Sequence, residues 1–311
     1  MVLVNALIGG GRQIATRLLD WPGPLAEASD VVVPRGGSEA VATALVASGV
    51  VGDQRLFRLA LLIDRDGLLH AGEFAFPAHA SLRMVLDILR NARPVEHHVT
   101  IPEGRTAAEI ATLLDRATAL AGPLPAPIPE GTILPETYTY PRGLTRAALV
   151  ARAQAAMRDA LAAAWAGRAP DLPLASPEQA VILASIVEHE TARPEERPMV
   201  AAVFLNRLRE GMRLQADTTV VYAVSGGKSS LARKLTRADL ATDNPYNTYH
   251  VPGLPPGPID SPGLAAILAV LHPAASDALY FVADGSGGHV FARTLDEHNR
   301  NVARWRARET P

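Results

Sequence analysis

A glutamate at the end of an apolar segment is the strongest candidate for chemistry in this sequence. Glu188 follows residues 180–187, which are apolar on every helical face, so its carboxyl group is expected to lose hydration. Burial and the negative end of a helix dipole both raise the pKa of a carboxyl group and keep it protonated near neutral pH. Such a group can act as the general acid in glycosidic cleavage. The structural alternative is a salt bridge from Glu188 to Arg193 or Arg197.

Glu190 is the nearest competitor for the role of acid. Two residues along a helix correspond to a rotation of about 200°, so Glu188 and Glu190 cannot both face one cleft. We predict Glu188 as the general acid and base.

Polar side chains further along the chain suit a carbohydrate ligand. Gln215 and Asp217 precede an apolar run, and Tyr246, Asn247 and Thr248 precede a segment rich in proline and glycine. Amides and hydroxyls can bind sugar hydroxyls, and aromatic rings can stack on the apolar faces of sugars. We predict that these five residues position the substrate; the alternative is that each belongs to an ordinary loop.

Several other chemistries are disfavoured by residue type and spacing. The histidines show no HExxH spacing and cysteine is absent, so we predict no metal site. The glycine-rich segments at residues 9–11 and 284–288 do not join a strand to a helix, so no phosphate-bearing cofactor is expected. Ser185 lacks the G-x-S-x-G elbow of a serine hydrolase. The formal net charge of -2 does not favour a nucleic-acid partner.

Short helices and strands alternate along the chain, which predicts an α+β fold. In the N-terminal half, residues 56–63 and 81–89 are predicted to be helical and residues 70–76 extended. Strands at 278–283 and 289–292 are predicted to form a hairpin. Four C-terminal helices are expected from their capping residues; they begin near Ser176, Glu195, Ser261 and Thr294.

Residues 31–38 (VVVPRGGS) and 99–106 (VTIPEGRT) form an internal repeat, which indicates two copies of one unit. Each copy is predicted to be a strand ended by proline, then a glycine turn, then a residue that caps a helix. The capping residues are Ser38 and Thr106, and Thr106 forms a capping box with Glu109. The proline-rich stretch at 122–131 is predicted to be an extended connector.

Four segments resemble the endolytic murein transglycosylase family (MltG, or YceG-like): residues 183–191 (LASIVEHET), 196–224, 244–263 and 279–306. The similarity continues upstream through VTIPEGRT and LPETYTYPRG to GPLAEASDVVVPRG, and so covers the chain from about Gly23. Thr218 departs from the family pattern, which usually has proline there.

The resemblance implies a LysM-like region at residues 29–120, a connector at 121–175 and a catalytic region at 176–311. It implies internal cleavage of nascent glycan strands between N-acetylmuramic acid and N-acetylglucosamine, without a cofactor. In the family chemistry, the glutamate at position 188 protonates the glycosidic oxygen and then activates the muramyl 6-hydroxyl, which closes a 1,6-anhydro ring. One carboxyl group suffices because the attacking hydroxyl belongs to the substrate.

The family is anchored in the inner membrane by a single span, with the catalytic region facing the periplasm. Here the apolar run before Arg12 has about ten residues, whereas a span needs about 20, and no secretory signal is evident. Residues 1–28 are therefore interpreted as the remnant of a truncated anchor. The implied partners are peptidoglycan strands and cell-wall synthases of the elongation machinery.

Two alternative functions remain open at this point. A muramidase could use the same site with a water molecule guided by Asp217. A non-catalytic protein could instead bind glycan through the repeated strand-turn-helix units.

Overall fold

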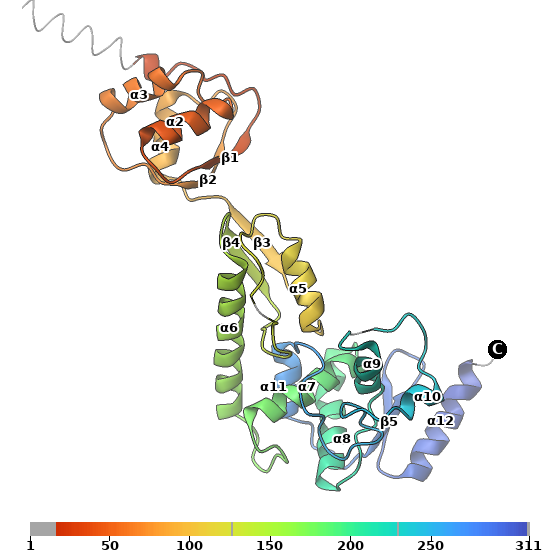
Figure 1. Cartoon of the computed structure of the whole chain (residues 1–311). Helices are drawn as coiled ribbons and strands as arrows, with labels where there is room; N and C mark the ends of the chain where they lie inside the picture. Colours follow the sequence, from red (N-terminus) through yellow and green to blue (C-terminus); the bar gives the residue numbers. More distant parts are fainter. Residues whose placement is uncertain (1–16, 126, 229, 310–311) are drawn as a thin grey trace, which may run out of the picture. The chain divides into compact units, whose positions relative to one another are not determined.

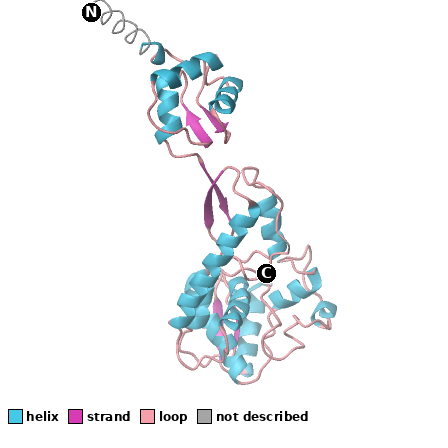
Figure 2. Cartoon of the chain, turned by 60° about the vertical axis from the view of Figure 1, so that its left-hand side comes forward, coloured by secondary structure: helices cyan, strands magenta, loops and turns pink. Residues whose placement is uncertain are grey.

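The computed structural model describes residues 17–309 except 126 and 229 and divides the chain into two compact units. The first unit contains the chain up to His98 together with Thr139–Leu144. The second contains Val99–Tyr138 and the chain from Thr145 onward. Helices predominate and the strands occur as three short pairs, so the predicted α+β class is confirmed (Figure 2).

A pair of strands and three helices make up the first unit (Figure 1). Strands β1 and β2 pair antiparallel, with Val31 opposite Phe74. Helices α2, α3 and α4 pack with this strand pair around a core of buried aromatic and aliphatic side chains, among them Phe57 and Leu86. The bounds are β1 (Ser29–Val33), α2 (Ser38–Ala47), α3 (Gln54–Ile63), β2 (Gly72–Phe76) and α4 (Leu82–Asn91).

Strands β3 (Glu96–Thr100) and β4 (Thr137–Pro141) pair with each other at the point where the chain passes between the units. The remaining elements belong to the second unit. They are α5 (Ala107–Asp115), α6 (Arg146–Ala166), α7 (Pro177–Glu190), the 3-10 turn η1 (Pro194–Glu196), α8 (Arg197–Arg209), α9 (Asp217–Ser225), α10 (Arg237–Leu240), α11 (Leu264–Leu271), β5 (Tyr280–Ala283), β6 (His289–Ala292) and α12 (Leu295–Glu309).

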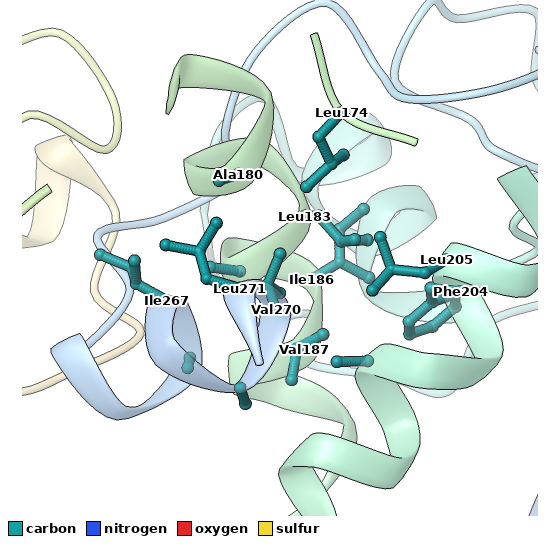
Figure 3. Packing of buried hydrophobic residues seen from close by; sticks show 14 of the residues in the cluster. Leu174, Ala180, Leu183, Ile186, Val187, Phe204, Leu205, Ile267, Val270 and Leu271 are labelled. Atoms are coloured by element: carbon teal, nitrogen blue, oxygen red, sulfur yellow. The ribbon is translucent and has the colours of Figure 1, made fainter. Parts of the chain in front are cut away.

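The core of the second unit forms where α7, α8 and α11 pack together (Figure 3). Leu183 and Ile186 of α7 are fully buried there beside Leu205 of α8 and Val270 of α11. A helix that is apolar on every face needs neighbours on all sides, and α7 has them. The last turn of α7, which carries both candidate glutamates, therefore extends from the best-packed part of this unit.

Most of the predicted helix starts are confirmed by their capping bonds. Ser176 accepts a hydrogen bond from the Gln179 backbone, and Thr106 and Glu109 form the expected capping box. Thr294 and Glu297 cap α12 in the same reciprocal way. The hairpin β5–β6 is also present.

Two predicted helix starts differ from the structure. Ser38 caps nothing, because Gly37 occupies the N-cap position of α2 and Ser38 is already helical. The helix expected from Ser261 begins at Leu264, because Ser261 pairs through its backbone with Arg105 instead.

Three helices were not anticipated from the sequence, and the shortest of them is α10. Helix α6 lies in the stretch taken as a connector, where an alanine-rich run after the cap residue Thr145 was the available signal. Helix α9 begins at Asp217 and includes the apolar run that follows it, for which no helix was predicted.

The two compact units meet along the chain after His98, Tyr138 and Leu144, whereas the predicted regions meet after residues 120 and 175. The two copies of the repeat each form a strand, a turn and a helix, but the first lies in the first unit and the helix of the second lies in the second unit. Residues 1–16, which carry most of the predicted anchor remnant, lie outside the described residues. In the part that is described, no helix combines the length and the apolar character that a bilayer span requires.

Leu271→Ala is expected to destabilise the second unit by about 2–5 kcal/mol, because Leu271 is fully buried in the core and its loss leaves a cavity. Leu268→Ala, on the same helix, is the matched control, because Leu268 is 39% exposed and should change stability by less than about 1 kcal/mol. Calorimetric unfolding of both variants measures the difference. Equal losses would contradict the packing described for α11.

Candidate functional site

Glu188 lies in the last turn of α7 with its side chain only 5% exposed. Its Oε1 atom accepts a hydrogen bond from Nη2 of Arg197 at 3.0 Å, and its Oε2 atom accepts one from the backbone N–H of Gly263 at 2.9 Å. Both oxygens are therefore occupied by partners within the protein.

The sequence suggested two roles for Glu188, a general acid with a raised pKa and a partner in a salt bridge, and the structure has features of both. Burial raises its pKa, as predicted, while the Gly263 hydrogen bond and the Arg197 charge oppose that rise. The salt bridge considered as the alternative is also present, and Arg197 rather than Arg193 supplies it. The pKa of Glu188 is raised on balance, which favours the protonated form that a general acid needs.

Glu190 is the last residue of α7 and has different surroundings. Its Oε1 atom accepts a hydrogen bond from the Thr218 hydroxyl at 3.3 Å. Burial raises the pKa of Glu190 to about 7, and the neighbouring charge of Asp217 acts in the same direction. Only weaker opposing effects come from Thr218, His189 and Arg207. At neutral pH this carboxyl group can therefore both donate and accept a proton.

Glu190 lines a cavity of about 370 Å³ in the second unit, and Glu188 does not. Polar and apolar side chains from widely separated segments share its wall. They are Glu190, Phe204, Arg207, Leu214, Gln215, Ala216, Asp217, Tyr249, Tyr280, Phe281, Leu295 and His298. A cavity with an apolar wall and a few convergent polar groups is typical of a ligand site.

Gln215 and Asp217, two of the residues predicted to contact substrate, lie at the cavity with Glu190. Gln215 is exposed and has a backbone φ of 53°, a left-handed conformation that costs energy in a residue other than glycine. The Tyr249 hydroxyl donates a 2.6 Å hydrogen bond to Asp217 and so fixes the direction of that carboxylate.

Asn247 and Thr248 are fully buried, so the structure gives them a supporting position where direct contact with substrate was predicted. The Asn247 amide donates hydrogen bonds to the carbonyls of Leu240 and Thr242, at 3.0 and 2.8 Å. The Thr248 hydroxyl accepts one from the Ala216 backbone at 3.0 Å. These bonds hold the loops around Gln215 in place.

Tyr246 also lies away from the residues that line the cavity. Its ring is half-buried against Tyr222, with the ring centroids 4.9 Å apart. Beside this pair, Glu130 accepts hydrogen bonds from the Tyr222 hydroxyl and the Ala107 backbone. Burial raises the pKa of Glu130 to about 7. Sequence reasoning missed this buried acid, although Ile128-Pro129-Glu130-Gly131 repeats the Pro-Glu-Gly turn at residues 102–104.

Three residues that line the cavity were not singled out in the sequence: Arg207, Tyr280 and His298. The Arg207 guanidinium donates to the carbonyls of Leu214 and Leu279 and lies over the Tyr280 ring. The other ring contact of Tyr280 is with His298, in a stacked arrangement. Burial lowers the pKa of His298, so this imidazole is neutral at pH 7.

Among the described residues, no group of three or more His, Asp and Glu side chains is arranged to hold a metal ion. The polar groups at the cavity are carboxyl, amide, phenol, imidazole and guanidinium groups, which suit proton transfer and hydrogen bonding to a polar substrate.

A model of the YceG-like family matches residues 31–304. An endolytic murein transglycosylase of Streptococcus pneumoniae is 30% identical over 320 residues, which cover 88% of this chain and 57% of that protein. One from Bacillus subtilis is 45% identical over 118 residues, or 38% of this chain and 32% of that protein. A crystal structure of a yceG-like protein from Listeria monocytogenes matches with a TM-score of 0.54 and 28% identity, covering 88% of this chain and 98% of that one.

The chain thus spans only 57% of the length of the Streptococcus protein. The family model and the Listeria structure, by contrast, both extend over most of this chain, and the family match includes the cavity from Glu190 to His298.

Glu190→Gln is expected to stabilise the protein at pH 8 and not near pH 4.5. The folded protein binds the Glu190 proton more tightly than the unfolded chain does, because the pKa is about 7 in place of the ordinary 4.5. The resulting stability is fully present below about pH 4.5 and is lost as the pH rises through 7. Glutamine mimics the protonated acid, so the gain at pH 8 should be on the order of 1–3 kcal/mol.

Thermal unfolding at the two pH values measures this gain, and Glu195→Gln is the control because Glu195 is exposed. An equal effect of Glu190→Gln at both pH values would show that Glu190 does not titrate in this range.

Proposed function

The chain belongs to the YceG-like family, and from this we propose that it is a lytic transglycosylase that cleaves peptidoglycan glycan strands internally. We propose Glu188 as the general acid and base, as predicted from the sequence. The observation that carries the proposal is that the Glu188 carboxyl group lies buried at the end of α7, where burial raises its pKa.

Glu190, the last residue of α7, is the competing acid. A general acid works best with a pKa near the working pH, and burial raises the pKa of both carboxyl groups, that of Glu190 to about 7. The family motif at residues 183–191 favours Glu188, whereas the cavity shared with Gln215 and Asp217 favours Glu190. Arg197 and the Gly263 N–H hold the Glu188 carboxyl group in one direction.

The proposed reaction needs only one carboxyl group from the protein. Glu188 donates its proton to the glycosidic oxygen as the bond from that oxygen to C1 of N-acetylmuramic acid breaks. The Glu188 carboxylate then accepts the proton of the muramyl 6-hydroxyl, whose oxygen forms the new bond to C1. The product carries a 1,6-anhydro ring, and Glu188 returns to its protonated form.

The other polar residues of the cavity have distinct parts in this proposal. The exposed Gln215 amide can hydrogen-bond to sugar hydroxyls or to an acetamido group. The Asp217 charge raises the pKa of Glu190, the second acidic group at the end of α7. Thr248 supports the loop that carries Gln215, and Asn247 supports the loop at residues 240–242.

The position of Asp217 favours one alternative function, a muramidase. A second carboxylate at the cavity could guide a water molecule to C1, which would give a hydrolysed product. The two reactions differ by one water molecule in the mass of the product.

The proposed substrate implies a location in the cell envelope. We propose that the protein acts outside the cytoplasmic membrane, attached to the inner membrane by a single span and working beside synthases of the elongation machinery. We also propose a LysM-like role for residues 29–120 and the catalytic role for residues 176–311. The resemblance to the family supports these points.

Incubation of purified peptidoglycan with the protein is expected to release internal fragments with anhydro-muramyl ends, identified by mass spectrometry. Glu188→Gln should abolish the products while the fold, followed by circular dichroism, stays intact, because glutamine cannot donate the proton. Gln215→Ala should reduce the rate about tenfold to a hundredfold, since one positioning hydrogen bond is lost.

Reducing ends in place of anhydro ends would identify a muramidase. Full activity of Glu188→Gln would refute the assignment of the acid. Absence of products from every form, with glycan still bound, would identify a binding protein.

A further inference from the structure

Asp260 is a buried carboxyl group that the proposed reaction does not use. Its side chain is fully buried, and neither of its oxygens has a hydrogen-bond partner in the described part of the chain. The one cation that reaches it among those residues is His189, whose Nε2 atom lies 2.8 Å from Oδ2 of Asp260. Burying an ionised carboxylate without partners is costly, so Asp260 depends on this imidazole ring.

His189 lies in the last turn of α7, directly after the proposed acid Glu188. Its ring packs on the backbone of Gly104, where an added Cβ would lie 3.1 Å from Cε1 of the ring and 3.5 Å from Cγ of Glu188. Gly104 has a φ of 70°, a left-handed conformation that favours glycine. The imidazole ring and the acid therefore pack on one backbone surface that has no room for a side chain.

Residues 259–263, which lead into α11, contact α7 at three points. The contacts are the Ile259 N–H with the Ser185 hydroxyl at 3.1 Å, Asp260 with His189 at 2.8 Å, and the Gly263 N–H with Oε2 of Glu188 at 2.9 Å. The contact between Asp260 and His189 lies between the other two along the segment. The position of the Gly263 N–H, and with it the direction of the Glu188 carboxyl group, therefore depends on how this segment is held.

The other side of the segment is held by the loop that follows β3. The Gly104 N–H donates a hydrogen bond to the Ser261 carbonyl at 3.0 Å, and the Ser261 N–H donates one to the Arg105 carbonyl at 2.9 Å. These are backbone bonds, so they form whatever side chains the segment carries. On the side of α7, by contrast, side chains make the contacts and decide where the segment lies.

The charges around His189 and Asp260 favour an ion pair. The hydrogen bond to Asp260 raises the pKa of His189 above its ordinary 6.5 against the opposing effect of burial, and the charges of Glu188 and Glu190 also raise it. Burial raises the pKa of Asp260 to about 6, although His189 opposes that rise. At pH 6.5 the imidazole is therefore mostly protonated and the Asp260 carboxyl group is mostly ionised.

We propose that His189 and Asp260 are a positioning pair for the reaction: their contact holds residues 259–263 against the end of α7 and so keeps the Gly263 N–H directed at the Glu188 carboxyl group. This inference rests on the proposed function, in which Glu188 is the acid. Neither member of the pair gives a proton to the substrate. The pair acts through the direction of Oε2 of Glu188, whose N–H partner it holds in place.

Loss of one member of the pair and loss of both have different consequences. His189→Gln leaves the Asp260 carboxylate buried without a cation, which favours displacement of the segment toward water. Asp260→Asn removes the buried charge and keeps an oxygen that accepts a hydrogen bond from the imidazole, so this variant should fold in any case. In the double variant His189→Gln/Asp260→Asn, two amides face each other and can hydrogen-bond with no buried charge. The second substitution should therefore undo part of the damage caused by the first.

The test compares wild type, the two single variants and the double variant at pH 6.5. The first measurement is the rate of hydrogen exchange of the Gly263 N–H, followed by NMR, which reports whether this N–H keeps its partner and needs no substrate. The second measurement is kcat and KM for cleavage of glycan strands. Thermal unfolding of each variant records the cost in stability.

His189→Gln is expected to speed the exchange of the Gly263 N–H about tenfold or more. It should lower kcat about tenfold to a hundredfold with KM little changed, because orientation is lost and binding is not. Asp260→Asn should give smaller changes in the same directions. The double variant should have a kcat about fivefold or more above that of His189→Gln, with slower exchange of the Gly263 N–H, because the two substitutions are coupled.

His97→Gln is the matched control. His97 is 26% exposed, close to the 28% of His189, and its Nε2 atom pairs with the buried Glu73 in the first unit. It should cost stability and leave the exchange of the Gly263 N–H, kcat and KM unchanged. If His189→Gln lowers stability as His97→Gln does and changes neither the exchange nor the rate, the pair is only structural and the inference is wrong.

The remaining outcomes separate this inference from the proposed function. A double variant as slow as His189→Gln, with the Gly263 N–H protected in both, would show that the imidazole acts on the substrate itself and would overturn the inference alone. If Glu188→Gln stays active, the assignment of the acid fails and the positioning role fails with it. If wild type cleaves no glycan, the proposed function fails, and the exchange of the Gly263 N–H still decides whether the pair holds the segment.

Discussion

The burial of carboxyl groups at the end of an apolar helix is the constraint on which the second unit depends. Helix α7 is enclosed by α8 and α11, so its last turn cannot turn its charged residues freely to solvent. A buried charge needs partners or a shifted pKa, because desolvation otherwise costs several kcal/mol. The structure meets this requirement in two different ways, two residues apart.

Glu188 and Glu190 differ in the sign of the charge beside them. Glu188 faces the cation Arg197 and a backbone N–H, which stabilise its ionised form against burial. Glu190 faces the anion Asp217, which adds to burial and stabilises the protonated form. One helical turn thus carries one carboxyl group oriented by a cation and a backbone N–H and another that lies beside an anion, as a rotation of about 200° permits.

Local patterns along the sequence predicted the helices of the second unit better than its site. The caps at Ser176 and Thr294 depend on residues within one turn, so they can be read directly from the sequence. The salt bridge from Glu188 to Arg197 was also within reach, since the two residues are only nine positions apart in the sequence. The cavity was not, because its wall joins residues 190, 215–217 and 280–298, which only tertiary packing brings together.

The burial of Asn247 and Thr248 shows why residue type alone is a weak guide to substrate contact. An amide and a hydroxyl suit sugars, but they equally suit unpaired backbone groups of irregular loops, which must be satisfied when they are buried. Thr248 accepts a hydrogen bond from the Ala216 N–H, beside the strained backbone of Gln215. A strained conformation persists only when its surroundings hold it. The fully buried residues therefore contribute to the site through the geometry of Gln215, and the exposed amide is the group that can meet a ligand.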